Sequence, residues 1–178
     1  MTRERALAML TLAVPTGPGT WLDLGAGDGL FTRALARRLG EGGMVIAIDQ
    51  KARALRGIPT SDGGSIRTAV GDIRQLDLMS EVPEALDGAL CANVLHFIPD
   101  PKAVLLELAN RLVPGGRVVL IEYNREQGSR WVPYPIPRRQ LEGLFRGSGL
   151  EAPEVVGTHA SRFGGELYVA VGRAAFRR

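Results

Sequence analysis

The sequence predicts an α/β fold built on a doubly wound, seven-stranded, mostly parallel sheet that closes with a C-terminal antiparallel hairpin. Three observations lead to this fold class. Continuous apolar runs of strand length, such as residues 44–49, alternate with helical segments, as in parallel sheets covered on both faces. Acidic residues stand at the ends of three consecutive strands. The last two apolar runs, 154–159 and 166–172, are separated only by a glycine-bearing turn over 161–165, which predicts a hairpin.

Length and composition indicate one domain over residues 1–178. Hydrophobic residues make up 45% and charged residues 23% of the chain, which is ordinary for a globular protein. The net charge is +3, but the cationic residues are scattered, whereas a nucleic-acid-binding face needs a cluster. No stretch approaches the roughly 18–20 continuous apolar residues of a membrane span. The single cysteine, Cys91, excludes an internal disulfide and a zinc–cysteine cluster, so we expect no metal site and a cytoplasmic location.

The elements follow in the order that a doubly wound sheet requires. The predicted strands are residues 20–24, 44–49, 65–70, 86–92, 117–123, 154–159 and 166–172. The predicted helices are residues 3–14, 29–39, 101–112 and 138–145. Pro15 and Gly40 are stop signals for the first two helices, and Pro101 suits the first position of the third. Residues 1–18 therefore form an N-terminal helix with its lead-in to the first strand.

The turn after the first strand carries the pattern Asp23-x-Gly25-x-Gly27-x-Gly29. Residues without Cβ let a ligand approach the backbone, and the helix start that follows offers unpaired N–H groups. Neither the dinucleotide fingerprint nor the P-loop is met, because position 30 is leucine and no Lys-Ser/Thr pair follows. A carboxylate at the strand end repels a pyrophosphate but suits an ammonium group. A glycine-rich turn without a ligand is the alternative.

This stretch resembles motif I of the class I S-adenosylmethionine-dependent methyltransferases, whose cofactor carries an amino-acid moiety and a sulfonium. The resemblance implies the Rossmann-like methyltransferase fold, and its C-terminal hairpin distinguishes that sheet from the dinucleotide-binding one. It also implies that S-adenosylmethionine is the cofactor. The residues that it places at the cofactor in this turn are Asp23, Gly25, Ala26 and Gly27.

Two further strand ends fit the same family. Asp49 ends the second strand, where a carboxylate can accept hydrogen bonds from both ribose hydroxyls, and Gln50 would flank the adenine. A helix N-cap is the alternative for Asp49. After the third strand, the resemblance implies that Asp72 accepts the adenine amino group and that Ile73 packs on the ring. An Asx turn is the alternative for Asp72.

Residues 93–101, Asn-Val-Leu-His-Phe-Ile-Pro-Asp-Pro, resemble the motif IV region of small-molecule methyltransferases. The resemblance implies that Asn93 bridges backbone and cofactor and that His96 points toward the crevice. There His96 is either a general base or a residue that only shapes the pocket, and no recognisable dyad contains it. Phe97 replaces the second histidine of many members. The chain lacks the Asn/Asp-Pro-Pro-Tyr/Phe sequence, which disfavours methylation of nucleobase amino groups.

The segment 124–137 is long and aromatic for a connection, and we assign it to the substrate side of the pocket. Its candidate substrate-binding residues are Arg130, Trp131 and Tyr134, together with His96. The alternative is that the two aromatic side chains only cover the sheet edge. Four arginines at 125, 130, 138 and 139 predict an anionic acceptor.

Taken in order, the motifs predict an S-adenosylmethionine-dependent methyltransferase that acts on a small or medium-sized acceptor by direct in-line methyl transfer. Two alternatives stay open. One is an RNA-modifying methyltransferase, because Trp131 and Tyr134 beside arginines can stack an exposed base. The other is a cofactor-binding module without catalysis, since a fold alone does not imply activity. The sequence identifies neither the acceptor atom nor the oligomeric state.

Overall fold

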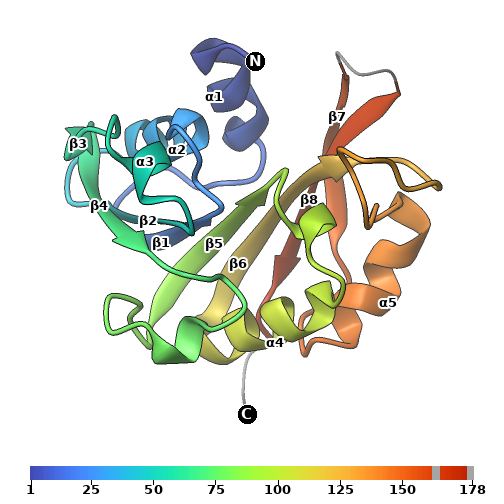
Figure 1. Cartoon of the computed structure of the whole chain (residues 1–178). Helices are drawn as coiled ribbons and strands as arrows, with labels where there is room; N and C mark the ends of the chain where they lie inside the picture. The colour runs from blue at the N-terminus through green and yellow to red at the C-terminus, as the bar shows by residue number, and fades with distance from the viewer. Residues whose placement is uncertain (162–164, 176–178) are drawn as a thin grey trace.

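The computed structural model describes residues 1–161 and 165–175 as one central sheet with helices on both faces (Figure 1). The strands are β1 (Thr20–Leu24), β2 (Met44–Asp49), β3 (Ser61–Asp62), β4 (Gly64–Val70), β5 (Leu86–Ala92), β6 (Leu112–Tyr123), β7 (Glu154–Ala160) and β8 (Glu166–Arg173). The α-helices are α1 (Arg3–Thr11), α2 (Leu30–Leu39), α3 (Ala52–Leu55), α4 (Pro101–Arg111) and α5 (Leu141–Arg146). Short 3₁₀ helices occupy Leu76–Leu78, Leu95–Phe97 and Arg138–Gln140.

The strand order is β3-β4-β2-β1-β5-β6-β8-β7. The pairs from β4 through β6 are parallel, and β8 pairs antiparallel with both β6 and β7. The predicted doubly wound sheet of seven strands with its C-terminal hairpin is therefore confirmed. The two-residue strand β3, antiparallel to β4, is an addition at the edge that apolar periodicity does not indicate. Residues 162–164 of the predicted hairpin turn lie outside the described part of the chain.

Alternation along β1 separates two hydrophobic cores. Leu22 and Leu24 face one core, which contains the apolar stripe of α4 and the buried side chains of α5. Trp21 faces the other core, with the buried residues of α1 and α2. Figure 1 shows α1 and α2 on the opposite face of the sheet from α4 and α5. Because β1, β2, β4, β5 and β6 are parallel, their carboxyl ends meet at one edge of the sheet.

Helix α1 ends earlier than predicted, at Thr11 instead of residue 14. Arg38 of α2 accounts for this end, because its Nε donates to the Val14 carbonyl at 2.9 Å and its Nη2 to the Thr11 carbonyl at 3.2 Å. Arg38 therefore ties the end of α1 to the helix beneath it. In the described part of the chain, no helix combines the length and the apolar character that crossing a membrane takes.

Candidate functional site

The glycine turn between β1 and α2 is a bare backbone loop held from both sides. Gly25, Gly27 and Gly29 have φ values of 70°, 55° and 80°. A Cβ on Gly25 would lie 2.3 Å from Val94 Cγ2, and one on Gly29 would lie 2.6 Å from Ile58 Cγ1. A Cβ on Gly27 would meet nothing nearer than the Gly25 carbonyl oxygen at 4.0 Å. Packing therefore requires the first and third glycines, whereas the second leaves its backbone open to a ligand.

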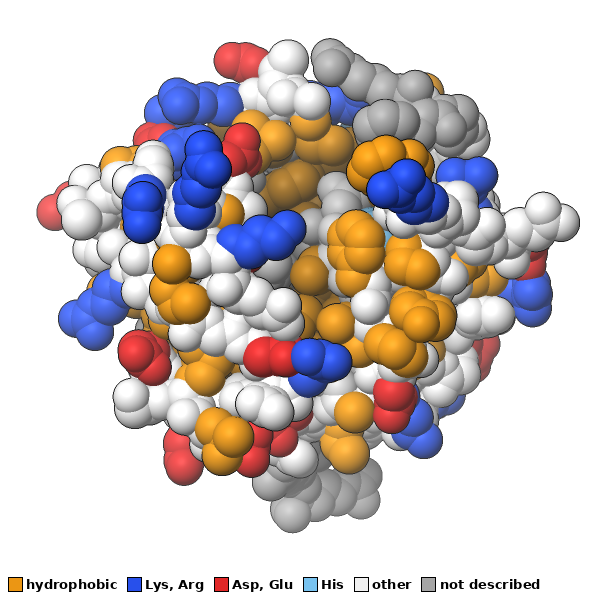
Figure 2. All heavy atoms as spheres, viewed as in Figure 1, with side chains coloured by type: hydrophobic (Ala, Val, Ile, Leu, Met, Phe, Trp, Pro, Cys, Tyr) orange, Lys and Arg blue, Asp and Glu red, His pale blue; other side chains and the backbone are white. Residues whose placement is uncertain are grey.

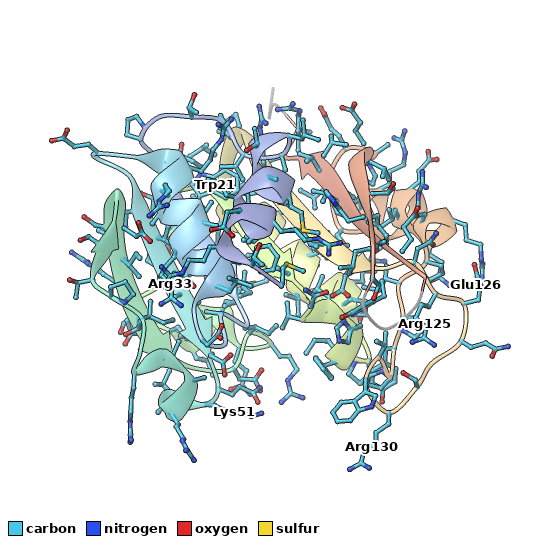
Figure 3. All side chains as sticks on the ribbon, turned by 90° about the horizontal axis from the view of Figure 1, so that it is seen from above. Trp21, Arg33, Lys51, Arg125, Glu126 and Arg130 are labelled. Carbon is cyan, nitrogen blue, oxygen red and sulfur yellow. The ribbon has the colours of Figure 1, made fainter. Side chains whose placement is uncertain are left out.

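Hydrogen bonds fix the same turn to β2 and to the loop after α3. The amides of Gly25 and Ala26 both donate to the Ile48 carbonyl, at 2.8 and 2.9 Å. Arg33 of α2, which Figure 3 labels, donates from Nη2 to the Asp28 carbonyl at 3.0 Å and from Nη1 to the Gly57 carbonyl at 3.3 Å. The side chain of Ala26 is buried with Ala47 and Leu55. The turn is thus held in one shape by neighbouring elements.

Asp23 lies beneath this turn and not on its open side. Its side chain is buried, and its Oδ2 accepts a hydrogen bond from Thr32 Oγ1 of α2 at 2.6 Å. Burial raises the pKa of the Asp23 carboxyl to about 7, and the charge of Asp49 contributes in the same direction. Asp23 therefore braces β1 against α2, and its assignment to the cofactor stays a prediction. The burial pattern could not be deduced from the motif alone.

The pKa of Asp23 predicts a pH dependence of stability. The native pKa is about 7, above the roughly 3.9 of an unfolded aspartate, so the native state binds this proton more tightly. The stabilisation of the native state by this proton is therefore complete below about pH 4 and is lost as the pH rises through about 7. We expect the wild type to lose on the order of 2 kcal/mol of unfolding free energy between pH 5 and pH 8 relative to Asp23→Asn. Urea unfolding at each pH measures this difference.

The control for this prediction is Asp77→Asn, because Asp77 is an exposed aspartate on a 3₁₀ helix. This variant should follow the wild-type curve. If Asp23→Asn and the wild type showed parallel pH profiles, the buried carboxyl would not be the source of the dependence.

Asp49 links the end of β2 to the open glycine. Its Oδ2 accepts a hydrogen bond from Gly27 N at 2.9 Å, and its Oδ1 accepts one from Lys51 N at 2.8 Å. The residue at the N-cap of α3 is Lys51, so the alternative of Asp49 as that cap is wrong. A carboxylate offers about four acceptor positions, which leaves room for two further donors. Gln50 follows it and is exposed.

Asp72 lies at the neighbouring strand end and is bound by Arg74. Its Oδ1 accepts from Arg74 N at 2.9 Å, which is the Asx turn kept as an alternative. The hydrogen bonds from the Arg74 side chain lower the pKa of Asp72 to about 2, and one from Gln50 acts in the same direction. Asp72 and Gln50 are thus brought together, as the sequence predicts. Ile73 is buried in the core, and its packing on a ligand ring stays a prediction.

Asn93 directly follows β5 and has a strained conformation. Its φ is 54°, and it is the only residue other than glycine with a positive φ in the part of the chain that the structure describes. Its amide donates to the Ile121 carbonyl at 2.8 Å, while its buried Oδ1 has no hydrogen-bond partner among residues 1–161 and 165–175. A buried acceptor without a donor is costly, and strain of this kind is concentrated at functional sites.

A cavity of about 190 Å³ lies beside Asn93. It is lined by the N-terminal region with α1, by the segments at the carboxyl ends of β5 and β6, and by the hairpin of β7 and β8. The described lining residues are Met1, Arg5, Asn93, Tyr123, Ala160, Ser161 and Leu167. Figure 2 shows the face viewed in Figure 1, which is hollowed, with hydrophobic side chains deep inside and Lys or Arg side chains near the rim. Arg5 links α1 to β7 at this cavity, because its guanidinium donates a hydrogen bond to the Ala160 carbonyl. Sequence patterns did not indicate the contribution of β7 and β8.

His96 and Glu122 form a buried pair. Nδ1 of His96 lies 2.6 Å from Glu122 Oε2, and both side chains are almost fully enclosed, at 3% and 0% exposure. Glu122 Oε1 also accepts hydrogen bonds from Val94 N at 3.0 Å and from His96 N at 3.3 Å. Glu122 therefore holds the backbone turn that follows Asn93. The sequence showed no partner for His96, and the structure pairs it with Glu122; the role of His96 at the crevice stays a prediction.

What the sequence did not reveal was the pairing of Glu122 with His96. A glutamate in an otherwise apolar strand of the sheet interior is rarely buried without a partner. The sequence pointed to no particular partner, because His96 lies 26 residues earlier in the chain and on another element.

The loop over residues 124–137 contacts the same turn. Tyr134 N donates to the His96 carbonyl at 2.9 Å, and the Ile136 carbonyl accepts a hydrogen bond from Tyr168 Oη at 2.7 Å. Val132 and Ile136 are buried, whereas Trp131 is 75% and Tyr134 47% exposed. Both aromatic side chains are therefore largely accessible to solvent. The guanidinium of Arg130 lies 5.7 Å from the Trp131 ring centre.

The four arginines of this region fall into two groups. Arg139 is paired with Glu126, and Arg138 Nη1 lies 3.5 Å from Glu166 Oε1. In the described part of the chain, neither Arg125 nor Arg130 forms an ion pair within 4.0 Å. Figure 3 shows Arg125 and Arg130 on the opposite side of the molecule from Arg33.

Known proteins with similar sequences are named as methyltransferases. The family described as a methyltransferase domain matches residues 22–120. A ubiquinone biosynthesis O-methyltransferase of Xylella fastidiosa is 34% identical over 124 residues, which are 67% of this chain and 48% of that protein. A methyltransferase of Mycobacterium bovis, named as uncharacterized, is 37% identical over 120 residues, or 65% of this chain and 56% of its own. This chain thus spans about half the length of these curated relatives.

Solved structures agree on the fold. A methyltransferase of calicheamicin biosynthesis, solved with S-adenosylhomocysteine bound, has a TM-score of 0.75 and 22% identity, covering 97% of this chain and 54% of its own. An S-adenosylmethionine-dependent methyltransferase of Methanosarcina mazei has a TM-score of 0.67 and 17% identity, covering 90% and 94%. The chain therefore belongs to the methyltransferase domain family and has the Rossmann-like fold of S-adenosylmethionine-dependent methyltransferases.

Proposed function

We propose that this protein binds S-adenosylmethionine at the carboxyl edge of its sheet and transfers the methyl group to a small or medium-sized acceptor. The observation that carries the proposal is the junction of Gly27 and Asp49. There the open backbone of Gly27 lies beside the Asp49 carboxylate, which can accept two further hydrogen bonds. Family membership supports the same activity.

The residues present fit such a cofactor. Asp49 accepts the ribose hydroxyls, and Gly27 offers the open backbone beside it. Asp72 takes the adenine amino group in place of one of the hydrogen bonds that Arg74 donates to its two carboxylate oxygens. The orphaned Oδ1 of Asn93 needs a donor, and an ammonium group is one. When bound, the cofactor supplies an electrophilic methyl group on its sulfonium sulfur.

The cavity beside Asn93 is the acceptor side of this proposal. Its size, about 190 Å³, admits the reacting part of a small molecule and not a folded partner. The chain positions the acceptor atom between Asn93 and Tyr123, so that orientation supplies most of the rate. An oxygen acceptor is favoured by the name of the Xylella fastidiosa relative.

His96 acts here as a positioning residue and not as the base. Its Nδ1 is bonded to Glu122, and the ring is 3% exposed, so it shapes the turn after Asn93 from within. The acceptor proton therefore leaves to water. Burial and the charge of Glu122 raise the pKa of the Tyr123 hydroxyl, which keeps that group protonated as a hydrogen-bond donor or acceptor.

An anionic acceptor follows from Arg125 and Arg130, the two loop arginines without a carboxylate partner among the described residues. We expect Arg125→Gln with Arg130→Gln to raise KM for the acceptor about tenfold, because charge-assisted hydrogen bonds are worth roughly 1.5–3 kcal/mol. The affinity for S-adenosylmethionine should not change. Release of S-adenosylhomocysteine, measured with a panel of small hydroxylated carboxylates and phenols, gives both quantities.

Arg139→Gln is the matched control, because this arginine is already neutralised by Glu126. A single-stranded RNA oligonucleotide belongs in the same panel, since the exposed Trp131 beside Arg130 is the arrangement that stacks a base. Turnover on the RNA alone would mean that the acceptor is an RNA and not a small molecule. Cofactor binding without turnover on any member would favour a binding module, and an equal loss of acceptor and cofactor affinity would remove the assigned role of the two arginines.

A further inference from the structure

A second cavity lies at the opposite edge of the sheet from the candidate site. It measures about 280 Å³ and is lined by the segment from Pro15 to Pro18, by Asp87 of β5, by the turn over 113–116 and by two arginines. The strands β1, β5 and β6 are parallel, so this edge carries their amino ends. In Figure 1 the starts of β5 and β6 lie low in the view, away from the tips of these strands and near the C-terminus.

The two arginines are directly opposed. Arg117 of β6 and Arg173 of β8 are register partners in an antiparallel pair, so both side chains leave the same face of the sheet. Like charges in this arrangement are destabilising. Burial lowers the pKa of Arg117, and the charge of Arg173 lowers it further. Among the ion pairs of the described residues, none within 4.0 Å includes either guanidinium.

The cavity also holds the carboxylate of Asp87, which forms no ion pair within 4.0 Å with either arginine. Its Oδ2 accepts a hydrogen bond from Thr20 N of β1 at 2.7 Å. Arg117 Nη1 donates to the Ala13 carbonyl at 3.0 Å, which fixes that guanidinium beside the cavity. The walls include Pro15, Pro18 and Pro114, whose rigid backbones hold the cavity in shape before a ligand arrives.

We propose that this cavity binds a phosphate group between Arg117 and Arg173. The planar guanidinium offers paired N–H donors that match the geometry of phosphate oxygens. A bound phosphate places negative charge between two like charges that the fold otherwise sets against each other. The volume holds a phosphate with a small attached group, so the source is either free phosphate or a small phosphate ester. The site is independent of the proposed methyl transfer, because it shares no residue with that edge.

Isothermal titration of the full chain with inorganic phosphate, pyrophosphate and adenosine monophosphate, at constant ionic strength, tests this site. We expect saturable binding with one ligand per chain and at least a tenfold weaker affinity in Arg173→Gln. Arg173 is exposed, so this variant should fold as the wild type does. Arg67→Gln is the control, because Arg67 is an exposed arginine on β4, which lies on the opposite side of β1 from β6 and β8 in the strand order.

Tighter binding of adenosine monophosphate than of inorganic phosphate identifies a phosphate ester as the source, and equal binding identifies free phosphate. Two results overturn the proposal. One is the absence of saturable binding of all three probes. The other is an equal loss of affinity in Arg173→Gln and Arg67→Gln, which reports general charge screening and no defined site.

Discussion

Replacing Asp49 with alanine is expected to weaken the binding of S-adenosylmethionine and S-adenosylhomocysteine at least 100-fold. The substitution removes the acceptor for two ribose hydroxyls, and hydrogen bonds to a charged group are worth roughly 1.5–3 kcal/mol each. It also releases the amide of Gly27, which Asp49 Oδ2 holds at 2.9 Å, so the open glycine turn loses its attachment to β2. Isothermal titration of the wild type and the variant with both compounds measures the change.

Two comparisons make this experiment specific. Asp62→Ala removes another partly buried aspartate, one that pairs with Arg37 on the edge strand β3, and should leave the affinity unchanged. NADH, titrated in parallel, should not bind, because the glycine spacing does not meet the dinucleotide fingerprint. Full cofactor affinity in Asp49→Ala would show that the ribose role is misassigned. Binding of NADH alone would mean that the fold carries another ligand.

Replacing Glu122 with alanine is expected to lower the free energy of unfolding by about 3–5 kcal/mol. Removing one partner of a buried pair leaves the other uncompensated, and here the backbone amides of Val94 and His96 lose their acceptor as well. Urea unfolding measures the loss. The double variant Glu122→Leu with His96→Leu should be more stable than Glu122→Ala, because no polar side chain is then left unpaired.

Activity separates positioning from a purely structural role in the same variants. Glu122→Gln keeps the shape of the side chain and an acceptor oxygen, so we expect it to fold and to raise KM for the acceptor more than it lowers kcat. That pattern is expected because Glu122 holds the turn after Asn93, which lines the acceptor cavity. A destabilisation of Glu122→Ala below about 1 kcal/mol would show that the pair contributes no more than a surface salt bridge.

The sequence predicted the parts of this protein that depend on local pattern. Apolar runs, glycine stops and the lack of a helix before the last strand were enough for the sheet, its parallel centre and its hairpin. Strand ends in a parallel sheet share one edge, so Asp49 and Asp72 could be placed together from their positions in the chain. The glycine turn was predicted as well, because its backbone angles permit few other residues.

What the sequence left open was which way each side chain faces and what it meets there. Asp23 and Ile73 belong to the motifs, yet one braces β1 against α2 and the other fills the core. His96 was expected to face the crevice, but its side chain is buried and hydrogen-bonded to Glu122, which lies 26 residues later in the chain on β6. Pairings between distant residues such as Arg117 and Arg173 depend on strand register. Local sequence decides which segments become strands. Long-range packing decides which side chains are buried and which partners they meet, because a buried polar atom must form its hydrogen bonds with the groups that the folded sheet places beside it.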